Sequence, residues 1–111
     1  MMASIALRLA VCLFPGVCAL DYQGPIELLG FLSPDSPSRL PATPKFQLKI
    51  TYIAPEKTVK EGGIQPWSGH GPKIVADTTY ESAIEDKDQF DILLVPGGKI
   101  RFPPTSALSL I

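Results

Sequence analysis

Apolar residues gather in three runs along the chain, and each run is typical of a buried strand. Residues 5–14 are branched or otherwise apolar without clear alternation, as in a strand that is covered on both faces of a parallel sheet. Residues 46–54 alternate apolar and polar positions, which predicts a strand with one buried and one partly wet face. The third run, residues 91–95, ends in the glycine turn Pro96-Gly97-Gly98.

Two helices are predicted between these strands. Gly24-Pro25 begins the first, because proline is tolerated at an early helical position, and Ser33-Pro34 ends it. The second is a brief polar helix over residues 80–87, preceded by Asp77 as an N-cap or turn residue and by 73–76 as a short strand. Strands that alternate with helices predict an α/β fold, here the N-terminal half of a doubly wound parallel sheet.

The segments between these elements are rich in proline and glycine. Residues 34–44 predict a surface loop, and residues 55–72 predict a loop or a pair of short hairpin strands. Two residues of the second segment could carry a function. Trp67 could line a pocket, although packing of the loop onto the sheet is favoured, and His70 fits an exposed loop histidine better than a base or ligand.

Composition and charge narrow the classes of partner. Ten basic and eleven acidic residues give a formal net charge of -1, and no lysine or arginine cluster is present, which argues against nucleic acid or an anionic membrane surface as a partner. No uninterrupted apolar run approaches the ~18 residues of a membrane span. We therefore expect small molecules or protein surfaces as partners.

The cysteines and the N-terminus give information about the cellular compartment of the protein. Cys12 and Cys18 lack the companions of a metal site, and two reduced thiols are favoured over a disulfide between them. Residues 1–19 imitate a secretory signal, but they lack a basic start and Arg8 interrupts the apolar run. We expect a cytoplasmic protein, with a small secreted protein as the weaker alternative.

Asp21 is the first candidate for chemistry. It is placed by the pattern in the loop after the first strand, and ligands of open α/β sheets bind beyond the carboxyl ends of the strands. An Asx turn or a helix N-cap is the alternative role. Glu27, expected in the first helical turn, fits a partner of the helix dipole, and Cys18 fits a structural thiol better than a nucleophile.

Four motifs in order resemble the ThiJ/PfpI superfamily, a class I glutamine amidotransferase-like group, and in particular its isonitrile hydratase-like branch. They are Leu13-Phe14-Pro15-Gly16 with Leu20-Asp21, Gly24-Pro25-Ile26-Glu27, Asp77-Thr78-Thr79-Tyr80, and Asp91-Ile92-Leu93-Leu94-Val95-Pro96-Gly97-Gly98. The resemblance covers about residues 5–98. It implies a flavodoxin-like fold, a small-molecule substrate and no cofactor or metal.

The resemblance also implies roles for particular residues. Asp21 matches the acid that pairs with a nucleophilic cysteine, and backbone N–H groups at Gly97 and Gly98 match a turn that receives developing negative charge. The family's cysteine would follow the glycine turn by a further helix and strand. We expect residues 1–98 to be the N-terminal half of such a domain and residues 99–111, with Pro103-Pro104, to be a tail foreign to the family.

Two functions follow from this pattern. The first is that of a ThiJ/PfpI-domain protein, related to cysteine-dependent hydratases and inactive as this fragment. The second is that of a non-catalytic half-domain that acts by binding a ligand or a partner. Because the last strand would expose an apolar edge, pairing with another chain, including a homo-oligomer, is also expected.

Overall fold

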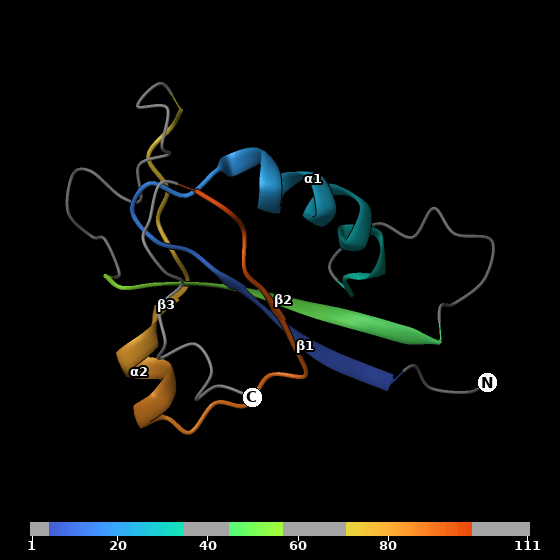
Figure 1. Ribbon diagram of the computed structural model, residues 1–111. Helices are drawn as coiled ribbons and strands as arrows, with labels where there is room; N and C mark the ends of the chain where they lie inside the picture. The colour runs from blue at the N-terminus through green and yellow to red at the C-terminus, as the bar shows by residue number, and fades with distance from the viewer. Residues whose placement is uncertain (1–4, 35–44, 57–70, 99–111) are drawn as a thin grey trace.

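The computed structural model describes residues 5–34, 45–56 and 71–98, and these form an α/β fold (Figure 1). Four strands make one sheet: β1 (Ile5–Cys12), β2 (Phe46–Ala54), β3 (Thr78–Thr79) and β4 (Ile92–Leu94). The helical elements are α1 (Ala19–Leu29), the 3₁₀ turn η1 (Gly30–Leu32) and α2 (Tyr80–Glu85). None of the helices in these ranges is long and apolar enough to cross a membrane.

The sheet is parallel throughout, with the strand order β3-β2-β1-β4. β1 pairs along its whole length with β2, from Ile5 opposite Phe46 to Cys12 opposite Ile53. On its other side β1 pairs with the three residues of β4. The chain therefore leaves β1 toward one side for β2 and β3, and later returns to the opposite side for β4.

β1 is buried on both faces from Leu9 to its end at Cys12, as its apolar run predicts. Leu9, Val11 and Leu13 belong to a cluster with α1, whereas Ala10 and Cys12 belong to a cluster with α2, and none of the five is more than 1% exposed. Alternate residues of a strand point to opposite faces, so the single run supplies both layers. The two helices accordingly lie on opposite faces of the sheet (Figure 1).

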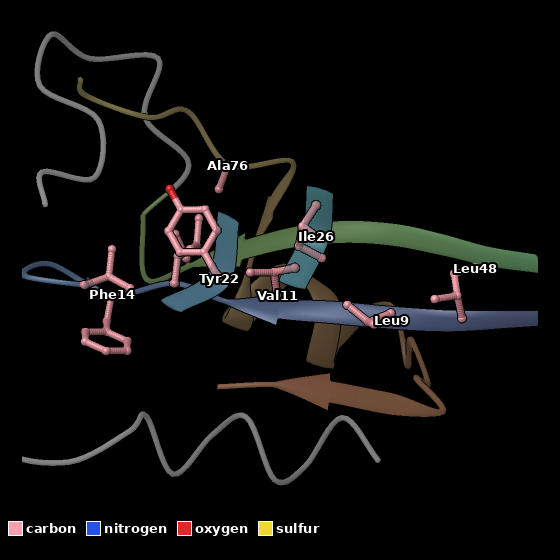
Figure 2. Close-up of a cluster of buried hydrophobic side chains, with 10 residues drawn as sticks. Leu9, Val11, Phe14, Tyr22, Ile26, Leu48 and Ala76 are labelled. Carbon is pink, nitrogen blue, oxygen red and sulfur yellow. The ribbon is translucent and has the colours of Figure 1, made fainter. Parts of the chain in front are cut away.

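Figure 2 shows the larger cluster, on the α1 face. Tyr22 and Ile26 descend from α1 onto Val11 and Leu9 of β1, with Leu48 of β2 beside them. Polar and apolar positions are only weakly separated around this helix, and its buried residues are Tyr22 and Ile26. These two side chains therefore hold α1 to the sheet.

The helix begins earlier than the sequence pattern predicts. Its first residue is Ala19 and not a residue near Gly24, with Cys18 at the N-cap and Pro25 inside the helix. Pro25 cannot donate the backbone bond that position 25 would make to position 21, which costs stability. Packing of Tyr22 and Ile26 outweighs that cost, because tertiary burial decides most helices in proteins.

The segment before α2 also differs from the prediction. Residues 73–76 do not form a strand, although Ile74 makes an isolated bridge, and the strand in this region is Thr78–Thr79. Asp77 caps no helix: its carboxylate accepts from the Tyr52 N–H at 2.8 Å, and its own N–H donates to the Tyr52 carbonyl at 2.8 Å. The N-cap of α2 is Thr79, whose hydroxyl accepts from the Ser82 N–H at 3.0 Å.

Arg8, the one charge in the apolar run of β1, binds the residues that precede β4. Its guanidinium lies 4.6 Å from the centroid of the Phe90 ring and donates to the Gln89 carbonyl at 3.0 Å. The backbones of Arg8 and Asp91 are also joined, since Asp91 N–H donates to the Arg8 carbonyl at 2.8 Å. In the described part of the chain β4 is an edge strand, with Ile92 39% and Val95 42% exposed, so the predicted apolar edge is present.

The two cysteines occupy different surroundings. Cys12 is buried under α2, and burial raises the pKa of its thiol to about 11, an effect that the neighbouring Tyr80 hydroxyl only partly offsets. The Tyr80 hydroxyl itself donates to the Leu13 carbonyl at 2.9 Å. Cys18 is half-buried and carries no side-chain cap bond. Alkylation requires an accessible thiolate, so only Cys18 is in a position to react.

We expect iodoacetamide at pH 7.5 to modify Cys18 in the folded chain and Cys12 only after unfolding, as read by peptide mass spectrometry. The variant Cys18→Ser is the matched control and should take up no label until urea is added. Labelling of folded Cys18→Ser at the rate of the unfolded chain would contradict the burial of Cys12.

Candidate functional site

The strand order reverses next to β1, and the candidate site lies at that point. β2 and β4 flank β1 on opposite sides, so the segments that follow β1 and β4 meet at the carboxyl edge of the sheet. In open α/β sheets, ligands bind in the crevice at such a reversal. Asp21 follows β1, and Gly97 and Gly98 follow β4, so the structure brings all three predicted site residues together.

Asp21 contacts Gly97 directly. One carboxylate oxygen, Oδ2, accepts a hydrogen bond from the Gly97 N–H at 3.1 Å. Asp21 lies in the first turn of α1, three residues after the N-cap, and not in a loop or at the cap as expected. The carboxylate is therefore carried by the first turn of a helix.

Backbone contacts tie the same two segments together. Cys18 N–H donates to the Gly97 carbonyl at 2.8 Å, and Val17 forms an antiparallel bridge with Gly98. Both polar backbone groups of Gly97 are thus used, one by Cys18 and one by the side chain of Asp21. A ligand that needs the Gly97 N–H as a donor must first displace the Asp21 carboxylate.

The close approach of the segments explains the two glycines. A Cβ at Gly98 would collide with the Gly16 carbonyl and would lie 2.9 Å from the Val17 Cα and 3.0 Å from the Phe14 ring. A Cβ at Gly97 would lie 2.8 Å from Asp21 Oδ2. Gly16 has a φ of 86°, a conformation that side chains other than glycine rarely adopt. Glycine at these positions lets the segment after β4 lie against the segment after β1.

The remaining candidates lie away from this contact. Glu27 falls in the third turn of α1, so its predicted place in the first turn is wrong, and its carboxylate accepts from the Gln23 side chain at 2.9 Å. Cys18 is next to the contact through its backbone only. Trp67 and His70 lie outside the described residues. Within residues 5–34, 45–56 and 71–98, no three acidic, histidine or cysteine side chains come together as a metal site would require.

A cavity on the other flank of α1 was not indicated by the sequence pattern. Its volume is about 370 Å³, and it includes Tyr22 of α1 and Tyr52 of β2. Tyr52 occupies an apolar position of the predicted strand, whereas Tyr22 falls in the predicted loop before the helix. The signal that could have drawn attention to them is chemical: a hydroxyl on each of two elements that pack together.

Comparisons with protein-family models, with curated proteins and with solved structures found no match for this chain. The resemblance to the ThiJ/PfpI superfamily therefore stays a prediction from the four sequence motifs.

We expect Asp21→Ala to lower the free energy of unfolding by about 1 kcal/mol, the usual contribution of a hydrogen bond, measured from the urea midpoint. Asp21→Asn should lose less, because an amide oxygen can still accept from Gly97. The control is Glu27→Ala, an exposed carboxylate on the same helix whose bond stays within the helix, with a change within about 0.5 kcal/mol. Equal losses in Asp21→Ala and Glu27→Ala would contradict a tertiary role for Asp21.

The glycine contact makes a second prediction. Gly98→Ala should destabilise the fold by about 1–3 kcal/mol, as overpacking against backbone does, because neither the Gly16 carbonyl nor the Val17 Cα can move aside. Gly30→Ala is the matched control: nothing lies within 4 Å of its added Cβ, and its φ of -60° suits alanine. Thermal unfolding followed by circular dichroism should show a lower midpoint for Gly98→Ala and an unchanged or raised one for Gly30→Ala.

Proposed function

We propose that this chain is a small-molecule-binding domain of the ThiJ/PfpI type, with Asp21, Gly97 and Gly98 at its site. The hydrogen bond between Asp21 and Gly97, at the reversal of strand order, is the observation that carries the proposal. The order β2-β1-β4 corresponds to the first three strands of a flavodoxin-like sheet, with β3 as a short addition at the edge. This correspondence supports the finer fold assignment that the motifs imply.

Asp21 would serve as the acid of the site. Its position in a helix and its bond to Gly97 limit the directions in which the carboxylate can point. A carboxylate held in this way can exchange a proton with a bound molecule or orient it by a hydrogen bond. A ligand group could replace the Gly97 N–H as the donor to Asp21. The segment after β4 would then lose this contact, so ligand binding would be coupled to the position of that segment.

The proposal assigns binding, and not turnover, to this chain. In the hydratase-like branch a cysteine attacks the substrate, and the motif that carries that cysteine has no counterpart among residues 1–111. Cys12 cannot replace it, because it is buried beneath α2 and its thiol pKa is raised. Cys18 contacts the site through its backbone, so a nucleophilic role for it is what the experiment below must exclude.

The alternative function is association with a partner. The edge strand β4 exposes Ile92, the residue directly after it, Val95, is also exposed, and an unpaired edge can bind another strand. A cytoplasmic location belongs to the same proposal. The secreted alternative would require removal of residues 1–19, which would take away β1, the central strand.

The test uses the purified chain with cyclohexyl isonitrile and its hydration product, N-cyclohexylformamide. We expect the formamide, which has both an N–H and a carbonyl, to shift the amide resonances of Asp21, Gly97 and Gly98 in ¹H–¹⁵N spectra, and the isonitrile, which has no donor, to shift them less. No formamide should form above the rate in buffer. Asp21→Asn should weaken these shifts, and Glu27→Gln should leave them unchanged. Absence of shifts at all three amides would overturn the site, and formamide formation that Cys18→Ser abolishes would overturn the non-catalytic assignment.

A further inference from the structure

The cavity beside α1 lies on the flank of the helix that faces away from Asp21. Asp21 faces β4, whereas the cavity opens between the start of α1, the end of β2 and the segment before β3. Its volume is about 370 Å³, within the range of pockets that hold small ligands. The lining is mostly apolar and consists of Ala19, Tyr22, Gln23, Tyr52, Pro72, Ile74 and Val75.

Two tyrosines form its aromatic wall. The rings of Tyr22 and Tyr52 meet edge to face, with centroids 6.2 Å apart and planes at 74°. In Figure 2 the Tyr22 ring lies beside Val11, and its hydroxyl points away from β1. No hydrogen-bond partner of either hydroxyl is found among the described residues. An aromatic ligand in the cavity would contact the rings of Tyr22 and Tyr52. It would also meet their two hydroxyls, each of which can donate or accept a hydrogen bond.

The electrostatics of the cavity select against an anion. None of the lining side chains within the described ranges carries a charge, so an ionic ligand would lose hydration without gaining a partner among them. Burial, followed by the nearby charges of Asp77 and Glu27, raises the pKa of Tyr52, and burial raises that of Tyr22. Both hydroxyls therefore stay protonated at neutral pH, and the two carboxylates make the surroundings of Tyr52 unfavourable for negative charge.

The mouth of the cavity exposes an apolar side chain. Val75 is 64% exposed, although it lies at the rim of a concave apolar surface. A bound ring would cover part of it and of the two tyrosines, at about 25 cal/mol per Å² of apolar surface removed from water.

We propose that this cavity binds a neutral, ring-containing small molecule that makes one hydrogen bond to the Tyr52 hydroxyl. The occupant would pack one side against Tyr22 and Ile74 and the other toward Val75. This site is separate from the Asp21 contact, so it can be present or absent whatever the outcome there.

The probes are 2-naphthol, which is neutral at pH 7, and 2-naphthoate, its anionic counterpart of similar shape. Titration calorimetry and ¹H–¹⁵N spectra of the full chain should show binding of 2-naphthol with shifts at Tyr22 and Tyr52, and binding of 2-naphthoate at least tenfold weaker. Equal binding of the two, or no binding of 2-naphthol, would overturn the proposal. Tighter binding of phenyltrimethylammonium would overturn the neutral ligand in favour of an organic cation.

Variants place the ligand in the cavity. Tyr52→Phe keeps the ring and removes the hydroxyl, and it should weaken 2-naphthol binding by about three- to tenfold, the range of a neutral hydrogen bond. Val75→Glu puts a charge at the rim and should abolish binding, whereas Ile84→Glu, at a 41% exposed position on α2, should not change it. Unchanged binding in Val75→Glu, with circular dichroism showing all variants folded, would overturn the location.

Two further controls separate the proposal from its competitors. Asp21→Asn should bind 2-naphthol as the parent chain does, because Asp21 lies on the other flank of α1. Light scattering should show that the chain keeps its mass when 2-naphthol binds. A dimer that Val75→Glu dissociates would show that a second copy covers the cavity, and this result would overturn the small-molecule assignment.

Discussion

Burial of β1 on both faces is the constraint on which the rest of the structure depends. Leu9 and Val11 belong to the cluster under α1, and Ala10 and Cys12 belong to the cluster under α2, so both helical layers pack onto this one strand. Its backbone is also paired on both edges, with β2 along its whole length and with β4 over three residues. β2 and β4 are therefore placed on either side of it, and the reversal of strand order follows from that placement.

The same strand fixes the position of α1. Tyr22 and Ile26 are the two buried residues of the helix, and both pack onto the β1 side chains. Because α1 packs onto the sheet through these two buried residues, one side of the helix faces β4 and the other side faces β2. The Asp21 contact occupies the first flank and the cavity the second, so both features depend on two buried side chains of an eleven-residue helix.

Much of the fold could be predicted from periodicity. The apolar runs predict β1 and β2, and the short polar segment after Thr79 predicts α2, because these signals come from burial itself. The start of α1 could not be predicted in this way. Gly24-Pro25 is a strong local signal for a helix start, and only the packing of Tyr22 onto the sheet, which the local sequence does not show, overrides it.

The site shows the same division. The sequence places Asp21 after one strand and Gly97 after another, and parallel strands bring such positions to one edge, so their proximity is predictable. The hydrogen bond between them is not, because it requires the helix to begin at Ala19 and to turn the carboxylate toward β4. The cavity could not be predicted, because the sequence does not show that Tyr22 and Tyr52 line the same apolar space.

The early start of α1 changes what Asp21 can do. In a loop, the carboxylate could move to meet a ligand while Gly97 kept its N–H free for negative charge. In the first turn of a helix, with Gly97 as its donor, the acid and the N–H are partners before any ligand arrives. A molecule that enters this crevice must offer Asp21 a replacement donor and Gly97 a replacement acceptor. Under the proposed function, the site would therefore favour a ligand with a donor and an acceptor side by side, such as an amide, over one with an acceptor alone.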